Sequence, residues 1–122
     1  MIKRLYITYI KNRGDGKTYS GMASGFSDAN NILKRRESSH HKNKEGFGKA
    51  EIDRISYDKN AIRGREQMLI DYHGGAQSEG GTSGNIYNSI SKRNKKGPKY
   101  ITAAIAAFGS LIFLAVCYLI II

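Results

Sequence analysis

At 122 residues, the chain has room for one small domain. Lys and Arg number 20 against 10 acidic residues, and the net charge of +10 favours a polyanionic partner, either nucleic acid or an anionic membrane surface. The single cysteine, Cys117, excludes an intrachain disulfide and a zinc cluster built from thiolates.

The N-terminal region has the pattern of a β-hairpin. Residues 2–11 are rich in Ile, Tyr and Thr, which favour a strand. The run Asn-Arg-Gly-Asp-Gly at residues 12–16 is a strong turn signal, and residues 17–20 begin a second strand. A loop rich in Gly, Ser and Ala then leads to the next element.

A helix is predicted from Ser27 or Asp28 to about His41, with Ser27 as a good N-terminal cap. Its apolar positions have helical spacing, and they are Ala29, Ile32 and Leu33. The same stripe continues through Arg36 to His40, whereas a solvated charge normally lies on the face opposite the apolar stripe. An arginine and a histidine at the edge of a core suit an anionic ligand. The alternative is a short amphipathic helix that ends in a polar turn.

The middle of the chain contains one ambiguous segment and one clear helix. Residues 47–56 are compatible with a third strand or with a short helix, because Ile52 and Ile55 suit either. The helix begins near Asp58 or Asn60 and ends at Gly74-Gly75, where two glycines stop it.

Glu66 lies on the apolar side of that helix, between Ile62 and Leu69. A carboxylate in such a place requires a metal ion, an arginine or a ligand. An ion pair with Arg36 or Arg63 is the alternative that involves no ligand.

The region after this helix carries few signals of regular structure. Residues 74–84 form a flexible Gly-rich loop, which lacks the GK[ST] ending of a phosphate-binding P-loop. Residues 85–90 are predicted as a short last strand or as an ordered segment that returns to the hairpin. Residues 91–99 form a basic linker that contains Pro98.

The C-terminal stretch from Tyr100 to Ile122 carries no charged residue. As a helix, its roughly 23 residues would span about 34 Å, enough for the hydrocarbon core of a bilayer. We therefore predict a single-pass membrane anchor through residues 100–122, although its first turns, up to Ala107, are also compatible with the preceding domain. The basic residues before it place the soluble domain on the cytoplasmic side. The predicted division is a domain over residues 1–97 and an anchor over residues 98–122.

Five short sequence elements follow one another along the chain. They are Ile7-Thr8-Tyr9, Tyr19-Ser20-Gly21, the pair Arg36 and His40, Glu66, and Asn85 or Asn88. In this order and spacing, the chain resembles the GIY-YIG endonuclease family over about residues 4–97, with Tyr6 or Thr8 as alternatives to Tyr9. The stretches SGMASG, LKRRESSHH, AIRGREQ and GGTSGN are also similar to nuclease-like domains at the C-terminal ends of bacterial polymorphic toxins. The resemblance implies a small α+β domain in which helices flank a short central sheet.

The resemblance also implies phosphodiester hydrolysis with one divalent metal ion, Mg²⁺ or Mn²⁺, held by Glu66. It assigns Arg36 to the charge of the transition state, and it assigns Tyr9, helped by Tyr19, to the attacking water. His40 would shuttle protons or contact phosphate, and Asn85 would position a backbone group or a water. The candidate nucleic-acid-binding cations are Lys17, Arg35, Arg63 and Arg65.

Three functions are compatible with these observations. The leading hypothesis is a membrane-tethered, metal-dependent endonuclease that acts on DNA in preference to RNA. A toxin-like origin would add an immunity-type protein inhibitor as a partner. A non-catalytic basic module that binds nucleic acid or a protein beside the membrane is the alternative, and a polybasic membrane adaptor is the third. Convergence of Arg36 and Glu66 with the two tyrosines in one cleft would favour the enzyme.

Overall fold

The first strand of the chain lies in the middle of a three-stranded antiparallel sheet. The computed structural model describes residues 2–111, and its strands are β1 (Leu5–Asn12), β2 (Thr18–Gly25) and β3 (Glu51–Ser56) in the order β2-β1-β3. The predicted hairpin and the α+β class are confirmed. Residues 47–56, for which the sequence allowed a strand or a short helix, contain β3, because the backbone of this segment pairs with the free side of β1.

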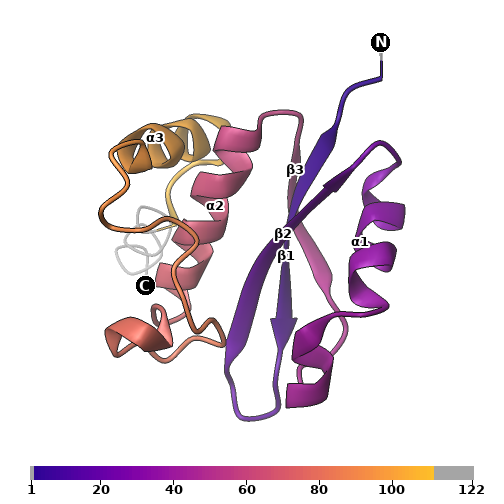
Figure 1. Cartoon of the computed structure of the whole chain (residues 1–122), viewed down its shortest axis with the longest axis vertical. Helices are drawn as coiled ribbons and strands as arrows, with labels where there is room; N and C mark the ends of the chain where they lie inside the picture. Colours follow the sequence, from indigo (N-terminus) through magenta and orange to yellow (C-terminus); the bar gives the residue numbers. More distant parts are fainter. Residues whose placement is uncertain (1, 112–122) are drawn as a thin grey trace, which may run out of the picture.

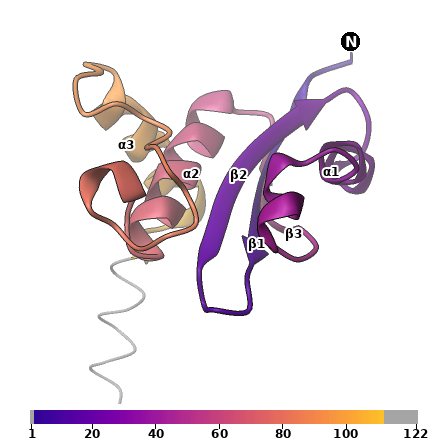
Figure 2. The ribbon, with the colours of Figure 1, turned by 60° about the horizontal axis from the view of Figure 1, so that its bottom comes forward.

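Helices cover both faces of this sheet (Figure 1). The alternation of β1 directs Ile7, Tyr9 and Lys11 toward α1 (Ala29–Glu37), where Ile7 and Tyr9 share a buried cluster with Ile32. Thr8 points the other way, toward α2 (Lys59–Tyr72), and donates to Asp53 over 2.8 Å. Figure 2 shows the same layering, with α1 on one side of the strands and α2 on the other.

The second strand is longer than predicted. Pairing with β1 continues as far as Leu5 opposite Gly25, so the segment predicted as a Gly-rich loop is largely strand. Because β2 has β1 on one side only, its other edge presents backbone groups that need partners. This open edge becomes one wall of the site described below.

The first helix is shorter than predicted, and His40 is not part of it. Asp28 caps the start of α1 by accepting from the Asn31 N–H over 2.9 Å. The helix ends at Glu37, since the Ser38 hydroxyl donates to the Arg35 carbonyl and so competes with further helical turns. His40 instead caps a separate 3₁₀ turn, η1 (His41–Glu45).

The second helix agrees closely with the sequence pattern. Asp58 caps it by accepting from the Asn60 N–H over 2.9 Å, and Gly74 and Gly75 follow its end with positive φ angles. After it, the Gly-rich loop contains a short 3₁₀ turn, η2 (Gln77–Glu79). Residues 85–90 form an ordered segment along the β2 edge and no strand, the second of the two predicted alternatives.

The C-terminal prediction of a membrane anchor is wrong for the part of the chain that the structure describes. No helix within residues 2–111 is long and apolar enough to span a bilayer. The start of the predicted anchor forms α3 (Gly97–Phe108), which packs along α2 and ends at Gly109. The remainder of the predicted anchor, residues 112–122, lies outside the described residues. The single-pass location with a cytoplasmic domain, which rested on that anchor, is corrected with it.

The reason for this correction lies in the contact between α2 and α3. A Cβ atom on Gly64 would lie 2.0 Å from the Tyr100 carbonyl oxygen, so only glycine allows the two backbones to approach so closely. Ala104 is completely buried at the same contact. The apolar residues of α3 therefore cover α2, which explains both the costly glycine inside α2 and the absence of charge from residues 100–108 of α3.

Candidate functional site

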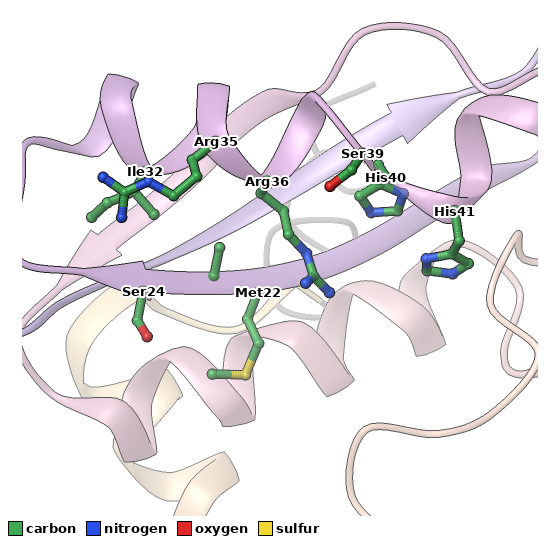
Figure 3. A pocket seen from close by; sticks show the side chains of 9 residues that line it. Met22, Ser24, Ile32, Arg35, Arg36, Ser39, His40 and His41 are labelled. Atoms are coloured by element: carbon green, nitrogen blue, oxygen red, sulfur yellow. The ribbon is translucent and has the colours of Figure 1, made fainter.

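A cavity of about 520 Å³ opens beside the edge of β2. Its walls come from β2, from α1, from the segment between α1 and η1 and from the first residue of η1, and they include Met22, Arg35, Arg36, His40 and His41. Figure 3 shows Arg36 and Met22 pointing into this space from their two elements. The cavity thus lies where the α1 face of the sheet passes into the β2 edge.

The Tyr9 hydroxyl lies at the centre of a buried hydrogen-bond group. The Arg36 Nε donates to its oxygen over 3.3 Å, and the His40 Nε2 lies 2.7 Å from the same oxygen. Tyr9 is completely buried, whereas Arg36 is exposed. Within residues 2–111 only the Nε of Arg36 is engaged in a hydrogen bond, so its two terminal nitrogens face the cavity as a ready pair of donors.

The backbone defines the tautomer of His40. The Lys42 N–H donates to His40 Nδ1 over 3.1 Å, so Nδ1 carries no proton and the neutral ring holds its proton on Nε2. That Nε2–H donates to Tyr9. Burial lowers the pKa of His40 to about 4, and the charges of His41, Lys11 and Arg36 act in the same direction. His40 is therefore neutral near pH 7, and it orients Tyr9 without contributing charge.

The two motif tyrosines occupy one face of the sheet and pack against the histidines. The Tyr19 and His40 rings meet edge to face with centroids 5.1 Å apart, and the Tyr9 and Tyr19 centroids are 6.4 Å apart. Burial raises the pKa of Tyr9, against the opposing hydrogen bond and charge of Arg36. Burial also raises the pKa of Tyr19, and the neighbouring Tyr9 adds to that rise. Both hydroxyls thus keep their protons at neutral pH.

Glu66 reaches the same edge of β2 from the opposite layer. It is half-buried on α2, and burial raises its pKa against the hydrogen bond of Ser89, the charges of Arg63 and Arg36, and the Met22 backbone N–H. Among residues 2–111 it forms no direct ion pair, so the predicted alternative of a pair with Arg36 or Arg63 is not realised there. A carboxylate from α2 and a guanidinium from α1 thus act on each other across the β2 edge.

The Asn85 side chain binds the backbone of the Tyr19-Ser20-Gly21 motif at the open edge of β2. Its Oδ1 accepts from the Ser20 N–H over 2.9 Å, and its Nδ2 donates to the Ser20 carbonyl over 2.8 Å. These two bonds imitate a neighbouring strand at the open edge of β2. Asn88, the other predicted candidate, instead accepts from Gln67 over 2.9 Å. The side chain of Asn85 is fully used by Ser20, so it holds the backbone of Tyr19 and Ser20 in place.

Of the four predicted nucleic-acid-binding cations, one borders the cavity and the other three contact protein groups elsewhere. Arg35 is exposed and borders the cavity. Arg63 lies over the Tyr100 ring, with 4.8 Å between its guanidinium carbon and the ring centroid, and the Lys17 Nζ donates to the Thr82 carbonyl over 3.0 Å. Arg65 is buried and donates to both carboxylate oxygens of Asp53 over 2.8 and 2.9 Å. Its role is structural, because the two guanidinium nitrogens that donate to Asp53 are not available to a phosphate.

The donor set around Glu66 fits a hydrated cation and does not fit a closed metal site. No group of three or more His, Cys, Asp or Glu residues that could hold a metal ion occurs within residues 2–111. Magnesium, however, is commonly held by one or two carboxylates and completed by water and substrate phosphates. Glu66 can supply this one carboxylate, because among residues 2–111 it has no direct ion pair and its side-chain hydrogen-bond partner is the Ser89 hydroxyl.

Sequence reasoning missed two residues of this site. Ser89 belongs to a segment with no regular structure, and nothing in the sequence places it beside Glu66. His41 lines the cavity and stacks on His40 with centroids 4.7 Å apart. The pair of adjacent histidines was a visible signal for His41, but the predicted helix would have turned the two rings apart.

The comparisons with known proteins add no identification. No family model, no curated protein and no solved structure matches the chain.

Proposed function

We propose that this chain is a metal-dependent endonuclease that hydrolyses phosphodiester bonds in DNA. The observation that carries the proposal is the hydrogen bond from the Arg36 Nε to the buried Tyr9 hydroxyl, which leaves the free end of Arg36 in the cavity while its charge acts on Glu66. The order of hairpin, Arg-bearing helix and Glu-bearing helix in the GIY-YIG resemblance supports the same activity.

Arg36 would bind the scissile phosphate. A planar guanidinium recognises two phosphate oxygens at once, and its fixed charge stabilises the negative charge that develops during hydrolysis. Tyr9 and His40 hold the guanidinium in one direction through the Nε bond, so less ordering is needed when the phosphate arrives. Tyr9 acts in this scheme as a positioning residue, because its ring is completely buried.

Glu66 would hold the divalent cation, Mg²⁺ or Mn²⁺. When bound, such an ion supplies positive charge that polarises the phosphate and stabilises the leaving oxygen. Glu66 must be ionised to bind it, and its raised pKa makes cation affinity fall as the pH decreases. The Ser89 hydroxyl keeps the carboxylate oriented toward the β2 edge.

The tyrosines contribute hydrogen bonds in preference to proton abstraction. Both have raised pKa values, so neither removes a proton from water efficiently at neutral pH. Without a side-chain base the attack depends on hydroxide, so we expect the cleavage rate to rise with pH from about 7 to about 10. His40 should contribute no inflection near pH 6.5, since its pKa of about 4 keeps it neutral there.

The decisive experiment is cleavage of supercoiled plasmid by the whole chain, with Mg²⁺, with Mn²⁺ and with EDTA. The variants are Glu66→Gln, which removes the charge at nearly constant shape, and Arg36→Ala. Exposed Glu51 has no role in the site, so Glu51→Gln is the matched control. Metal-dependent nicking that Glu66→Gln and Arg36→Ala abolish, and that Glu51→Gln retains, is the expected result.

Two other outcomes decide against parts of this proposal. A folded wild-type protein that binds DNA but does not cut it with either metal would make the chain a non-catalytic nucleic-acid-binding module. Nicking that survives Glu66→Gln at full rate would remove Glu66 from the metal site.

A further inference from the structure

A second pocket adjoins the first one and shares His41 with it. Its volume is about 270 Å³, and its lining residues are Tyr19, His41, Lys42, Asn85, Ile86 and Tyr87. His41 also lines the larger cavity that contains Arg36. A ligand that places a phosphate at Arg36 can therefore extend past His41 into this second pocket.

Two consecutive side chains of the second pocket are exposed although their backbone is fixed. Ile86 is 46% exposed and Tyr87 is 74% exposed. The backbone before them is held by the amide of Asn85 on Ser20, and the Ile86 carbonyl accepts from the Ser78 N–H over 2.9 Å. Apolar groups on a rigid segment are already placed for a ligand, so little conformational entropy is lost when one binds.

Three of the six residues that line this pocket carry aromatic rings, namely Tyr19, His41 and Tyr87. The Tyr19 and His41 rings meet edge to face with centroids 5.6 Å apart, and His41 is itself supported by stacking on His40. Tyr87 makes no contact with another ring among residues 2–111. The Lys42 side chain is buried under the rings, with its Nζ 5.5 Å from the Tyr19 centroid, so this pocket offers aromatic faces more than exposed charge.

We infer that this pocket binds an unpaired nucleobase next to the phosphate held at Arg36, so that the substrate is single-stranded at the point of cleavage. This inference rests on the proposed function. Aromatic side chains stack on any base, and the basic chain supplies the long-range attraction for the backbone. Bases in a duplex are covered on both faces by their neighbours, so a pocket of this kind suits only a base that has left the stack.

The test measures binding in EDTA, so that no cleavage occurs. Two labelled strands are compared, a dT12 oligonucleotide and an abasic strand with the same number of sugars and phosphates. We expect Tyr87→Ala to weaken binding of dT12 by about 5- to 150-fold, the range for one base–aromatic stack, and to leave binding of the abasic strand unchanged. Tyr87→Phe keeps the ring and should retain the wild-type affinity.

Tyr57 provides the matched control. It is 65% exposed and follows Ser56, which pairs with Tyr6 at the opposite end of the sheet, so Tyr57→Ala should change neither affinity. Equal weakening of both strands by Tyr87→Ala, or no weakening of either, would overturn the base pocket. Plasmid cleavage is scored separately. A base-dependent loss in a protein that never cuts DNA would remove the nuclease and leave the base pocket standing.

Discussion

Gly21 lies directly opposite Tyr9 in the β1–β2 pair, and a Cβ atom on Gly21 would come within 2.5 Å of the Tyr9 hydroxyl. The Tyr9 ring therefore lies over the bare backbone of Gly21, and this is how its hydroxyl reaches Arg36 and His40. We expect Gly21→Ala to displace the ring, to lower the free energy of unfolding by about 1–3 kcal/mol, and to reduce cleavage. Urea unfolding and the plasmid assay measure the two effects.

Gly14 provides the control for this substitution. A Cβ atom at Gly14 would meet nothing within 4 Å, so Gly14→Ala should change neither stability nor cleavage measurably. If Gly21→Ala left both quantities at the wild-type values, the close packing of Tyr9 on Gly21 would not be what positions Arg36.

A second prediction concerns the clamp between Asn85 and Ser20. Asn85→Ala removes two hydrogen bonds from the buried backbone of the edge strand, and we expect the free energy of unfolding to fall by about 1–3 kcal/mol. Asn30 is exposed on α1, so Asn30→Ala should change it by less than about 0.5 kcal/mol. Thermal unfolding of the two variants measures this difference. Similar losses in both would mean that Asn85 does not hold the β2 edge.

A third prediction separates the buried arginine at Asp53 from the exposed one. Asp53 is nearly buried, and it accepts two bonds from Arg65 and one from Thr8, so Arg65→Ala should cost roughly 3–5 kcal/mol of folding free energy. Arg54 lies 3.9 Å from the same carboxylate but is 42% exposed, and Arg54→Ala should cost less than about 1 kcal/mol. Denaturant unfolding measures both costs. Comparable effects would contradict the buried pair.

A fourth prediction follows from the lowered pKa of His40. Between pH 6.5 and about 4, the unfolded chain binds a proton at this position and the folded chain does not. The free energy of unfolding should therefore fall as the pH decreases through this window, by up to about 1.4 kcal/mol per pH unit for this one group.

The variant His40→Gln isolates this contribution. Burial also lowers the pKa of His73, which acts in the same direction, so the wild-type curve contains both histidines. The difference between the wild-type and His40→Gln curves should retain the slope due to His40 alone. Parallel curves for the two proteins between pH 6.5 and 4.5 would show that His40 binds its proton equally well in the folded and unfolded states.

Local signals in the sequence determined several parts of this protein. The turn at residues 12–16 defined the hairpin, and Asp58 together with Gly74-Gly75 defined both ends of α2, because caps and turns depend on a few neighbouring residues. The residue types Tyr9, Arg36 and His40 also indicated a shared site. The structure brings these three together around one hydroxyl.

Relations between distant segments were decided only by the tertiary structure. An uncharged stretch is compatible with a bilayer or with a protein surface. In the part of this stretch that the structure describes, α3 packs on α2 at Gly64, so a protein surface is its environment. Arg65 has the composition of a binding residue, but Asp53 on β3 makes it structural. Helical spacing placed His40 on α1, whereas that helix ends before Ser38, whose hydroxyl donates to the Arg35 carbonyl, and the Lys42 N–H holds the His40 ring toward Tyr9. In each case the deciding partner is far away or lies beyond a break in the helix, where periodicity in the sequence carries no information.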